Sequence, residues 1–226
     1  MTPEPSEGLA ALTDPRSPVS EAYRSLRTNL EFTSLEEPLR TMLVTSSSSE
    51  EGKSTTLANL AVTLAQANKE VIVADCDLRR PAQHDIFATP MEPGVTSLLL
   101  DEGALADPPL QDTSVPRLKL LPSGPLPPNP SELLGSQKME EMIQALADRA
   151  DMVLFDAPPV IVVTDAAVLA AKVDGVLLVI RAGSTKRDHA EQAVALLQKV
   201  NARVVGSVLT NAALDTAVGP YYASPT

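Results

Sequence analysis

The chain has 226 residues, of which 44% are hydrophobic and 21% are charged, an ordinary balance for a globular protein that is long enough to bury a full core. Eighteen basic residues stand against 29 acidic ones, and the net charge of −11 argues against binding to nucleic acid and against direct docking on anionic lipid. Cys76 is the only cysteine, which excludes an intramolecular disulfide and a zinc site built from cysteines.

The N-terminal part divides at about residue 18. Residues 1–17 contain several prolines and little hydrophobic periodicity, so we expect a flexible arm there. From Ser20 the pattern becomes helical, and Pro38 is expected to end this helix. Tyr23, on the same segment, is expected to be packed. The expected apolar face of the helix consists of Ala22, Leu26, Leu30 and Phe32.

Through the rest of the chain, short apolar runs alternate with helical patterns. Strands are expected at 41–46, 71–75, within 117–124, and at 152–156, 175–182 and 203–211. Helices are expected at about 53–68, 131–149, 165–173 and 187–200, with short helical pieces within 81–116. The strands are continuous apolar runs, which indicates a parallel sheet buried on both faces by crossover helices. We therefore expect one α/β domain over residues 18–211, with a mostly parallel sheet and helices on both faces, and a disordered tail over 212–226.

The strongest chemical signal is the segment SEEGKST (49–55), which lies between a predicted strand and a predicted helix, as a phosphate-binding loop requires. Backbone N–H groups and the start of the helix would face the anion. We expect Lys53 to reach the β- and γ-phosphates of ATP and Ser54 to bind Mg²⁺. The nucleotide contacts are expected from Glu51, Gly52, Lys53, Ser54, Thr55 and Asn211.

This loop departs from the usual pattern in two ways. Ser47 stands where the motif begins with glycine, five positions before Gly52. Glu50 and Glu51 add two carboxylates beside the phosphates, so we expect both to point outward. The alternative interpretation is a capped helix start that contains Gly-Lys-Ser by chance, and the flanking strand and helix argue against it.

Acidic residues follow two of the predicted strands. Asp75 and Asp77 lie at the carboxyl end of one strand, where ligands bind in open parallel sheets, and alternation places both on one side. Paired carboxylates at this place could coordinate a metal ion through water and accept the proton of a hydroxyl group. Two carboxylates at an ordinary solvated strand end would give the same sequence pattern. Asp156 ends the strand MVLFD and is expected to hold Mg²⁺ through water. Asp165 is expected to cap the helix that follows.

In order and spacing, these motifs resemble those of the bacterial tyrosine kinases of the capsule and exopolysaccharide type, the cytoplasmic half of a chain-length regulator system. The resemblance covers about residues 12–211 and is most specific in EAYRSLRTNLEF, EEGKSTTLANLA, DCDLRRPAQHDIF and VLFDAPP. The family shares its broad ATPase class with the MinD and ParA positioning proteins. Those carry a signature lysine four positions before the loop glycine, where this chain has Ser48. The kinase branch lacks that lysine, so the chain falls on the kinase side.

The resemblance implies ATP and Mg²⁺ as cofactors and gives roles to the motif residues. One of Asp75 and Asp77 would receive the tyrosine proton, and Asp77 is our choice. Arg79 and Arg80 could place positive charge near ATP, or Arg80 could be a solvated side chain with no such role. The sequence does not distinguish these two interpretations. Asn211 would recognise the adenine base. An asparagine that only starts a turn is an equally good interpretation of this position.

The resemblance also implies self-assembly and phosphorylation of the tail. The residues that match the family motif E-x-x-R-x-x-R, which is implicated in ring-like assembly, are Glu21, Arg24 and Arg27. Their spacing of three residues places them near one face of the predicted helix. Such a face could pair with a neighbouring subunit, and it could equally be an ordinary solvated surface. Tyr221 and Tyr222 stand where the family carries a larger cluster of phosphate-accepting tyrosines, so they are either substrates or a remnant.

The implied function is that of an ATP-dependent protein-tyrosine autokinase that phosphorylates tail tyrosines between subunits and regulates polymerisation or export of an exopolysaccharide. The implied partners are a membrane-spanning activator, expected to be a separate chain, further copies in a ring-like oligomer, and proteins that carry substrate tyrosines; nucleic acid is not expected. We expect the protein in the cytoplasm, recruited to the inner face of the membrane by its activator. The alternatives are a positioning ATPase of the MinD/ParA kind and a nucleotide-gated scaffold with little catalysis.

Overall fold

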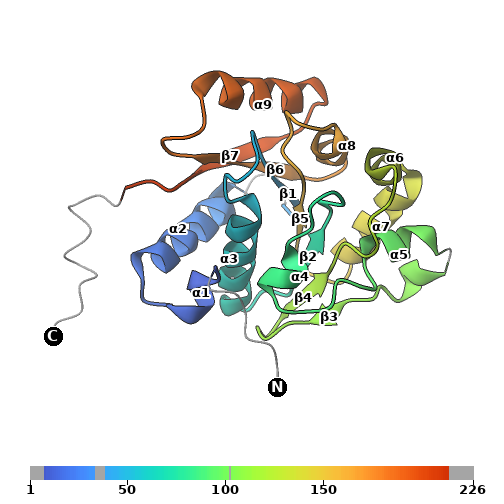
Figure 1. Ribbon diagram of the computed structural model, residues 1–226. Coiled ribbons are helices and arrows are strands. Elements are labelled where there is room, and N and C mark those ends of the chain that lie inside the picture. Colours follow the sequence, from blue (N-terminus) through green and yellow to red (C-terminus); the bar gives the residue numbers. More distant parts are fainter. Residues whose placement is uncertain (1–7, 34–38, 102, 214–226) are drawn as a thin grey trace.

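Seven strands form one sheet at the centre of the molecule (Figure 1). The computed structural model describes residues 8–33, 39–101 and 103–213. The strands are β1 (Thr41–Ser46), β2 (Val71–Asp75), β3 (Gln111–Asp112), β4 (Leu118–Leu121), β5 (Met152–Asp156), β6 (Gly175–Arg181) and β7 (Val204–Thr210). Their order is β3-β4-β2-β5-β1-β6-β7, and within the described ranges every pairing is parallel except that of β3 with β4. The mostly parallel sheet that the apolar runs predict is confirmed.

Helices cover both faces of this sheet, as predicted. One face carries α1 (Ala10–Thr13), α2 (Pro18–Thr33) and α3 (Lys53–Gln66). The other face carries α5 (Val95–Leu100), α6 (Pro130–Gly135), α7 (Gln137–Ala147), α8 (Asp165–Ala170) and α9 (Arg187–Lys199). Two short pieces, α4 (Gln83–Ile86) and the 3-10 turn η1 (Ala104–Ala106), lie in the connections after β2 and α5.

The central strand β1 shows why the fold needs two layers of helices. Met42 and Val44 belong to the apolar cluster that includes α3, whereas Leu43 belongs to the cluster on the opposite face. Alternation along the strand separates them in this way. All three are fully buried, and burial of one such side chain stabilises the fold by about 1.5–3 kcal/mol.

The register of the sheet brings the acidic strand ends together. Asp75 of β2 lies beside Asp156 of β5, and Asp156 lies beside Val44 of β1 on its other side. The loops that follow β1, β2 and β5 therefore leave the sheet at the same edge, which is where a parallel sheet binds its ligands.

The expectation of a flexible arm is wrong for residues 8–17. Leu9 is fully buried within the α3 cluster, and the N–H of Ala11 donates to Oδ1 of Asn59 at 2.9 Å. Asn59 in turn donates from Nδ2 to the Gly8 carbonyl at 2.8 Å. The segment is ordered because it covers the apolar side of α3 and satisfies a buried asparagine. Residues 1–7 and 214–226 lie outside the described residues, and so do Tyr221 and Tyr222.

Two predicted helices end or break earlier than expected. α2 ends at Thr33 and leaves Phe32 67% exposed, so Phe32 is not part of the apolar face; Ala22 is exposed as well, and Pro38 lies outside the described residues. The predicted helix over 131–149 is two helices, because Ser136 is extended and starts α7 by accepting the N–H of Met139 with its side chain.

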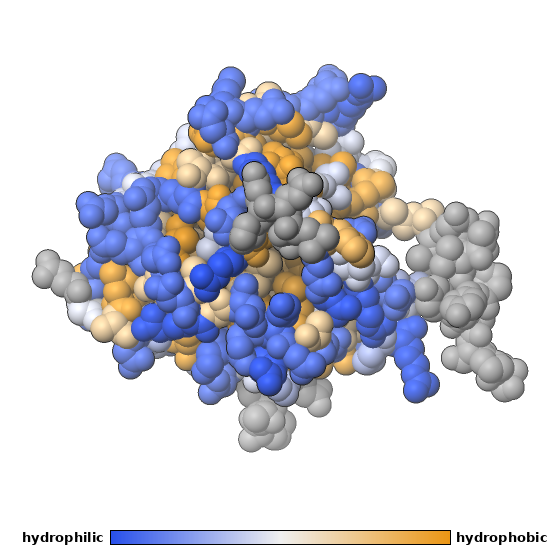
Figure 2. All heavy atoms as spheres, turned by 180° about the vertical axis from the view of Figure 1, so that it is seen from behind, coloured by the Kyte–Doolittle hydropathy of each residue, from blue (hydrophilic) through white to orange (hydrophobic). Residues whose placement is uncertain are grey.

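The outer strand β7 is only partly covered. Its residues are half-buried or exposed, and Leu209 is 54% exposed. Viewed from behind, hydrophobic surface lies below the polar residues at the top of the molecule, where α9 sits (Figure 2). A groove of about 330 Å³ is lined by residues of α9, β6 and β7. In the part of the chain that the structure describes, no helix has the length and apolar character that a membrane crossing requires.

Candidate nucleotide site

The loop between β1 and α3 presents the start of α3 as an anion site. Glu50 and Gly52 adopt left-handed backbone conformations, with φ of 62° and 86°. Glycine accepts this conformation at little cost, which explains its place directly before the helix. The first N–H groups of α3 have no partner within the helix and, with the helix dipole, attract a phosphate. The predicted strand–loop–helix arrangement is present, and α3 begins at Lys53.

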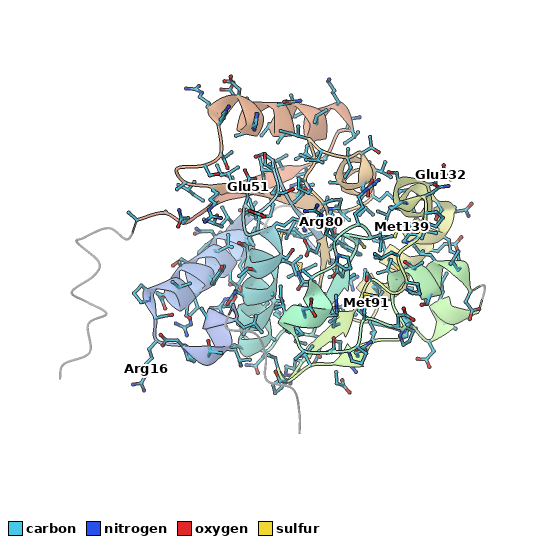
Figure 3. The ribbon with its side chains drawn as sticks, in the orientation of Figure 1. Arg16, Glu51, Arg80, Met91, Glu132 and Met139 are labelled. Carbon is cyan, nitrogen blue, oxygen red and sulfur yellow. The ribbon has the colours of Figure 1, made fainter. Side chains whose placement is uncertain are left out.

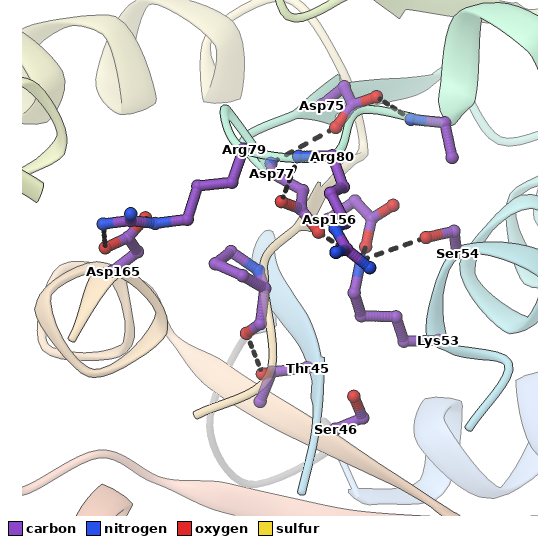
Figure 4. A network of polar contacts seen from close by, with 12 residues as sticks. Thr45, Ser46, Lys53, Ser54, Asp75, Asp77, Arg79, Arg80, Asp156 and Asp165 are labelled. Carbon is purple, nitrogen blue, oxygen red and sulfur yellow. Dashed lines mark hydrogen bonds and ion pairs between the residues drawn. The ribbon is translucent and has the colours of Figure 1, made fainter. Parts of the chain in front are cut away.

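The Lys53 ammonium group lies among carboxylates from two other strand ends (Figure 4). Its Nζ is 2.8 Å from Oδ2 of Asp77 and 3.0 Å from Oδ1 of Asp156, and it donates to Oγ of Ser54 at 3.1 Å. Burial acts to lower the pKa of Lys53, but the charges of Asp156 and Asp77 outweigh it and hold the pKa above its usual value. The structure thus brings together four of the predicted phosphate and metal residues.

Asp75 shapes the loop that follows β2. Its Oδ2 accepts the N–H groups of Ala82 and Gln83, both at 2.9 Å, and its Oδ1 accepts the N–H of Asp77 at 3.2 Å. Burial, reinforced by the charge of Asp156, raises the pKa of Asp75 to about 8, although these N–H groups and Lys53 act in the opposite direction. Both oxygens of Asp75 are occupied by backbone donors, so the side chain holds the loop in place.

Asp77 and Gln83 complete the polar cluster. Asp77 is nearly buried, and its Oδ1 accepts the N–H of Arg80 at 3.0 Å while its Oδ2 faces Lys53. Gln83 donates from Nε2 to Oδ2 of Asp156 at 2.7 Å and to the Ser54 carbonyl at 3.2 Å. Gln83 is not among the site residues predicted from the sequence, where its only signal is its place within the stretch RRPAQH after Asp77.

The expectation that Glu51 points outward is wrong, whereas Glu50 is exposed as expected. Glu51 is 3% exposed, and its Oε2 accepts the N–H groups of Ser47 and Ser48 at 2.8 and 3.0 Å. Its Oε1 accepts the hydroxyls of Ser47 and Thr185. The carboxylate binds the first two N–H groups of the loop, so its charge is satisfied within the protein. Glu51 and Arg80 both lie at the end of the sheet where α3 begins (Figure 3).

A pocket of about 250 Å³ lies next to the loop, on the side of α2 and β7. It is lined by Tyr23, Glu50, Glu51, Gly52, Thr55, Thr56, Arg181, Thr210 and Asn211. Asn211 has a φ of 54° and donates from Nδ2 to the Ala182 carbonyl at 3.4 Å. Tyr23 is half-buried, in line with the expectation that it is packed, and this burial raises its pKa. The pocket has the place expected for the base of a nucleotide whose phosphates sit on α3.

Asp165 has a role other than the predicted helix cap. It is the first residue of α8, and the residue before it, Thr164, forms no side-chain cap. The buried carboxylate of Asp165 accepts Nε and Nη2 of Arg79 at 2.8 and 3.0 Å, and also the hydroxyl of Ser131. Burial acts to raise the pKa of Asp165, but these hydrogen bonds and the charge of Arg79 outweigh it and lower the pKa.

The residues of the predicted assembly motif are bonded within their own chain. Arg24 pairs with Glu21 at 2.8 Å on the surface of α2 and also donates to the Pro15 carbonyl. Arg27 donates from Nη1 to the Thr63 carbonyl of α3 at 2.9 Å. Of the three motif residues, Arg27 therefore contacts the helix that begins at the phosphate loop, whereas Glu21 and Arg24 pair on the surface.

A model of the CobQ/CobB/MinD/ParA nucleotide-binding domain matches residues 42–219. The tyrosine-protein kinase YwqD of Bacillus subtilis strain 168 is 40% identical over 207 residues, which are 92% of this chain and 87% of that protein. The tyrosine-protein kinase CpsD of Streptococcus agalactiae is 36% identical over 84% of this chain and 82% of its own length. The tyrosine-protein kinase wzc of Salmonella typhi is 34% identical over 90% of this chain, but only 28% of that protein is matched.

Solved structures show the same likeness. The chimerical protein CapA2B2 superimposes with a TM-score of 0.85 at 34% identity, over 91% of this chain and 90% of that one. The BceF tyrosine kinase domain has a TM-score of 0.81 at 34% identity, over 89% of this chain and 81% of that one. The cell division ATPase MinD of Pyrococcus furiosus, 24% identical over 75% of this chain and 71% of its own, has a TM-score of 0.64 and shares the fold.

Proposed function

Because the chain belongs to the CobQ/CobB/MinD/ParA nucleotide-binding family and, within it, to the bacterial tyrosine kinases, we propose that it transfers the γ-phosphoryl group of ATP to tyrosine hydroxyls. Its own Tyr221 and Tyr222 are the first substrates. The observation that carries this proposal is the convergence of Lys53, Asp77 and Asp156 at one edge of the sheet. Three different loops supply a phosphate-binding cation and two carboxylates within hydrogen-bond distance of one another.

The reaction requires a proton acceptor, and the contacts favour Asp77. The tyrosine oxygen forms a bond to the γ-phosphorus while the bond from that phosphorus to the bridging oxygen breaks, and ADP leaves with the electron pair. The hydroxyl proton passes to a carboxylate. Asp75 is fully buried and bonded to backbone N–H groups through both oxygens. Asp77 is held on one side by Arg80 N–H, and its other oxygen becomes available once Lys53 binds phosphate instead.

The donors at this edge fit Mg²⁺. The hydroxyl of Ser54 and the carboxylate of Asp156 both contact the Lys53 ammonium group and would supply oxygen ligands to the ion. The buried Oε1 of Gln83 has no hydrogen-bond partner among the described residues. Within those residues no three or more His, Cys, Asp and Glu side chains form a metal cage. Mg²⁺ commonly uses one or two carboxylates, substrate phosphates and water, so this sparse donor set suits it. When bound, the ion neutralises charge on the phosphate oxygens.

We extend the proposal to the cellular role that the resemblance implies. The protein would act with a membrane-spanning activator and with further copies of itself, at the inner face of the membrane, to regulate polymerisation or export of an exopolysaccharide. The match to only 28% of the Salmonella wzc kinase is compatible with such a partnership, because that protein has much sequence outside the shared part.

Mass analysis of the purified protein incubated with Mg²⁺ and ATP tests the proposed reaction. We expect phosphate on Tyr221 or Tyr222 in the parent protein and none in Lys53→Met. ADP formed without phosphotyrosine would instead support a positioning ATPase, the second candidate that the shared fold with MinD favours. Nucleotide binding with neither product would support a scaffold.

A further inference from the structure

Two adjacent arginines in the loop after β2 extend toward different parts of the molecule (Figure 4). Arg79 reaches away from the phosphate loop to Asp165 at the start of α8 and bonds its carboxylate through two nitrogens. Asp165 is fully buried, and Ser131 of α6 donates the third hydrogen bond to it. A bidentate arginine–carboxylate pair fixes geometry as well as charge. Arg79 therefore ties the loop that carries Asp77 to two helices on the far side of the sheet.

Arg80 extends toward Lys53 and Asp156 (Figure 4). Its N–H donates to Oδ1 of Asp77 at 3.0 Å, which sets the direction in which the side chain leaves the loop. The side chain is exposed, and its guanidinium group forms no hydrogen bond or ion pair with the described residues. Because the group is solvated and unpaired, it can bind an incoming anion without first breaking an internal contact.

Three described cations that contact the phosphate loop or the residues beside it are already engaged. Lys53 lies between Asp77 and Asp156, Arg79 is bound to Asp165, and Arg181 donates to the Glu50 carbonyl at 2.9 Å. Ser48 stands where the positioning ATPases have their signature lysine. Phosphoryl transfer spreads charge over the oxygens of the transferred group, and enzymes commonly supply an arginine to stabilise it. At this edge, Arg80 is the side chain with that charge to offer.

We propose that Arg80 contacts the transferring phosphoryl group and stabilises its charge, and that Arg79 is the positioning residue that holds Arg80 and Asp77 over it. This proposal rests on the proposed phosphoryl transfer. It separates two neighbouring arginines that the sequence alone leaves equivalent. The role of Arg80 is catalytic, and the role of Arg79 is exerted through the Asp165 contact.

The test for Arg80 compares the affinity for ADP with the affinity for ADP plus aluminium fluoride, a planar mimic of the transferring group. Arg80→Ala should lose the extra affinity that aluminium fluoride adds, keep its affinity for ADP, and phosphorylate tyrosine about 10³-fold more slowly. Arg80→Lys should recover part of both losses. The matched control is Arg187→Ala, since Arg187 is 89% exposed and only pairs with Glu191 along α9; both readouts should stay at parent values.

Equal affinity of Arg80→Ala and the parent for the aluminium fluoride complex would overturn the proposal. An equal loss of affinity for ADP and for the mimic would also overturn it, because Arg80 would then attract phosphates without favouring the transferring group. If the parent binds the mimic through Arg80 but forms no phosphotyrosine, the tyrosine kinase proposal fails while the assignment of Arg80 stands for ATP hydrolysis.

The test for Arg79 uses Arg79→Ala and Asp165→Asn, singly and together. Each should weaken binding of the mimic relative to ADP, and the double variant should be no worse than the poorer single one, because the two residues act through one contact. Arg79→Ala removes a partly exposed side chain and is the safer variant if Asp165→Asn folds poorly. Additive losses, or a loss of thermal stability with unchanged binding of the mimic, would show that Arg79 does not position the loop.

Discussion

Arg27 donates a hydrogen bond from Nη1 to the backbone carbonyl of Thr63 at 2.9 Å, and this contact joins α2 to α3 within one chain. Arg24, one turn earlier, pairs instead with Glu21 on the surface. The three residues predicted to mediate assembly are therefore not equivalent. One of the two arginines holds the protomer together, and the other remains accessible to a neighbour.

This difference predicts separate effects of two substitutions. Arg27→Ala should lower the free energy of unfolding by about 1–3 kcal/mol, because it leaves a carbonyl of α3 without its charged donor. Arg24→Ala removes a surface ion pair and a hydrogen bond to the exposed Pro15 carbonyl, which water can replace, so it should cost less than about 1 kcal/mol. It should nevertheless lower the mass of any oligomer. Denaturant unfolding and light scattering measure the two effects. Equal destabilisation by both variants, or an unchanged oligomer mass with Arg24→Ala, would contradict this division.

Glu51 offers a test of how the phosphate loop is held. Glu51→Ala leaves the N–H groups of Ser47 and Ser48 without acceptors, which should cost about 1–3 kcal/mol for each group that water does not reach. The loosened loop should also bind ATP more weakly. Glu50→Ala is the matched control for stability, because it removes the same charge from an exposed neighbour. Thermal unfolding and calorimetric titration with ATP give the readouts, and equal melting temperatures of the two variants would count against this role.

The raised pKa of Asp75 leads us to expect that the stability of the fold depends on pH. Its pKa rises from 3.8 in the unfolded chain to about 8 in the fold, so the folded state binds the proton more tightly. The resulting stabilisation is fully present below pH 3.8 and is lost as the pH rises toward 8. The slope is at most about 1.4 kcal/mol per pH unit. Asp75→Asn cannot titrate, so between pH 5 and 8, with Mg²⁺ and nucleotide absent, its free energy of unfolding should fall less steeply than that of the parent. Parallel curves for the two proteins would refute this assignment.

The sequence predicted those parts of the site that depend on local pattern. A strand, a Gly-Lys-Ser segment and a helix place Lys53 without further information, and a parallel sheet brings the strand ends with Asp75 and Asp156 to the same edge. That the two residues lie side by side depends on the strand order, which the local pattern does not contain. The inward direction of Glu51 was missed because a backward turn of its side chain onto Ser47 and Ser48 leaves no mark in the pattern of the loop. Its remaining donor, Thr185, lies 134 residues away in the chain. Leu9 was missed for a related reason: an Ala/Leu segment between prolines looks flexible until the apolar side of α3 is known.

Exchange of phosphate between chains is the last prediction. The end of β7 lies beside the phosphate loop, because Oγ1 of Thr210 donates to the Glu51 carbonyl at 2.7 Å. The described part of the chain ends three residues later, at Ala213. Tyr221 follows eight residues later, at most about 28 Å along an extended chain, so reach alone permits transfer within a protomer or to a neighbour. Assembly through α2 would favour the neighbour, because an extended tail need not fold back onto its own site.

Mixing two inactive partners decides between these routes. Lys53→Met keeps both tail tyrosines but should not bind ATP productively, whereas a variant with Tyr221→Phe and Tyr222→Phe keeps the site but has no tail acceptor. Phosphate should appear on the Lys53→Met tail only in the mixture, and neither protein alone should show it. Each phosphate adds a charge of about −2 to a chain that already carries −11, so repulsion between neighbouring tails should lower the oligomer mass as phosphorylation proceeds. A Lys53→Met tail that stays free of phosphate in the mixture would show that the tail serves its own site. An oligomer mass that stays constant while the parent protein is phosphorylated would show that the charge does not drive dissociation.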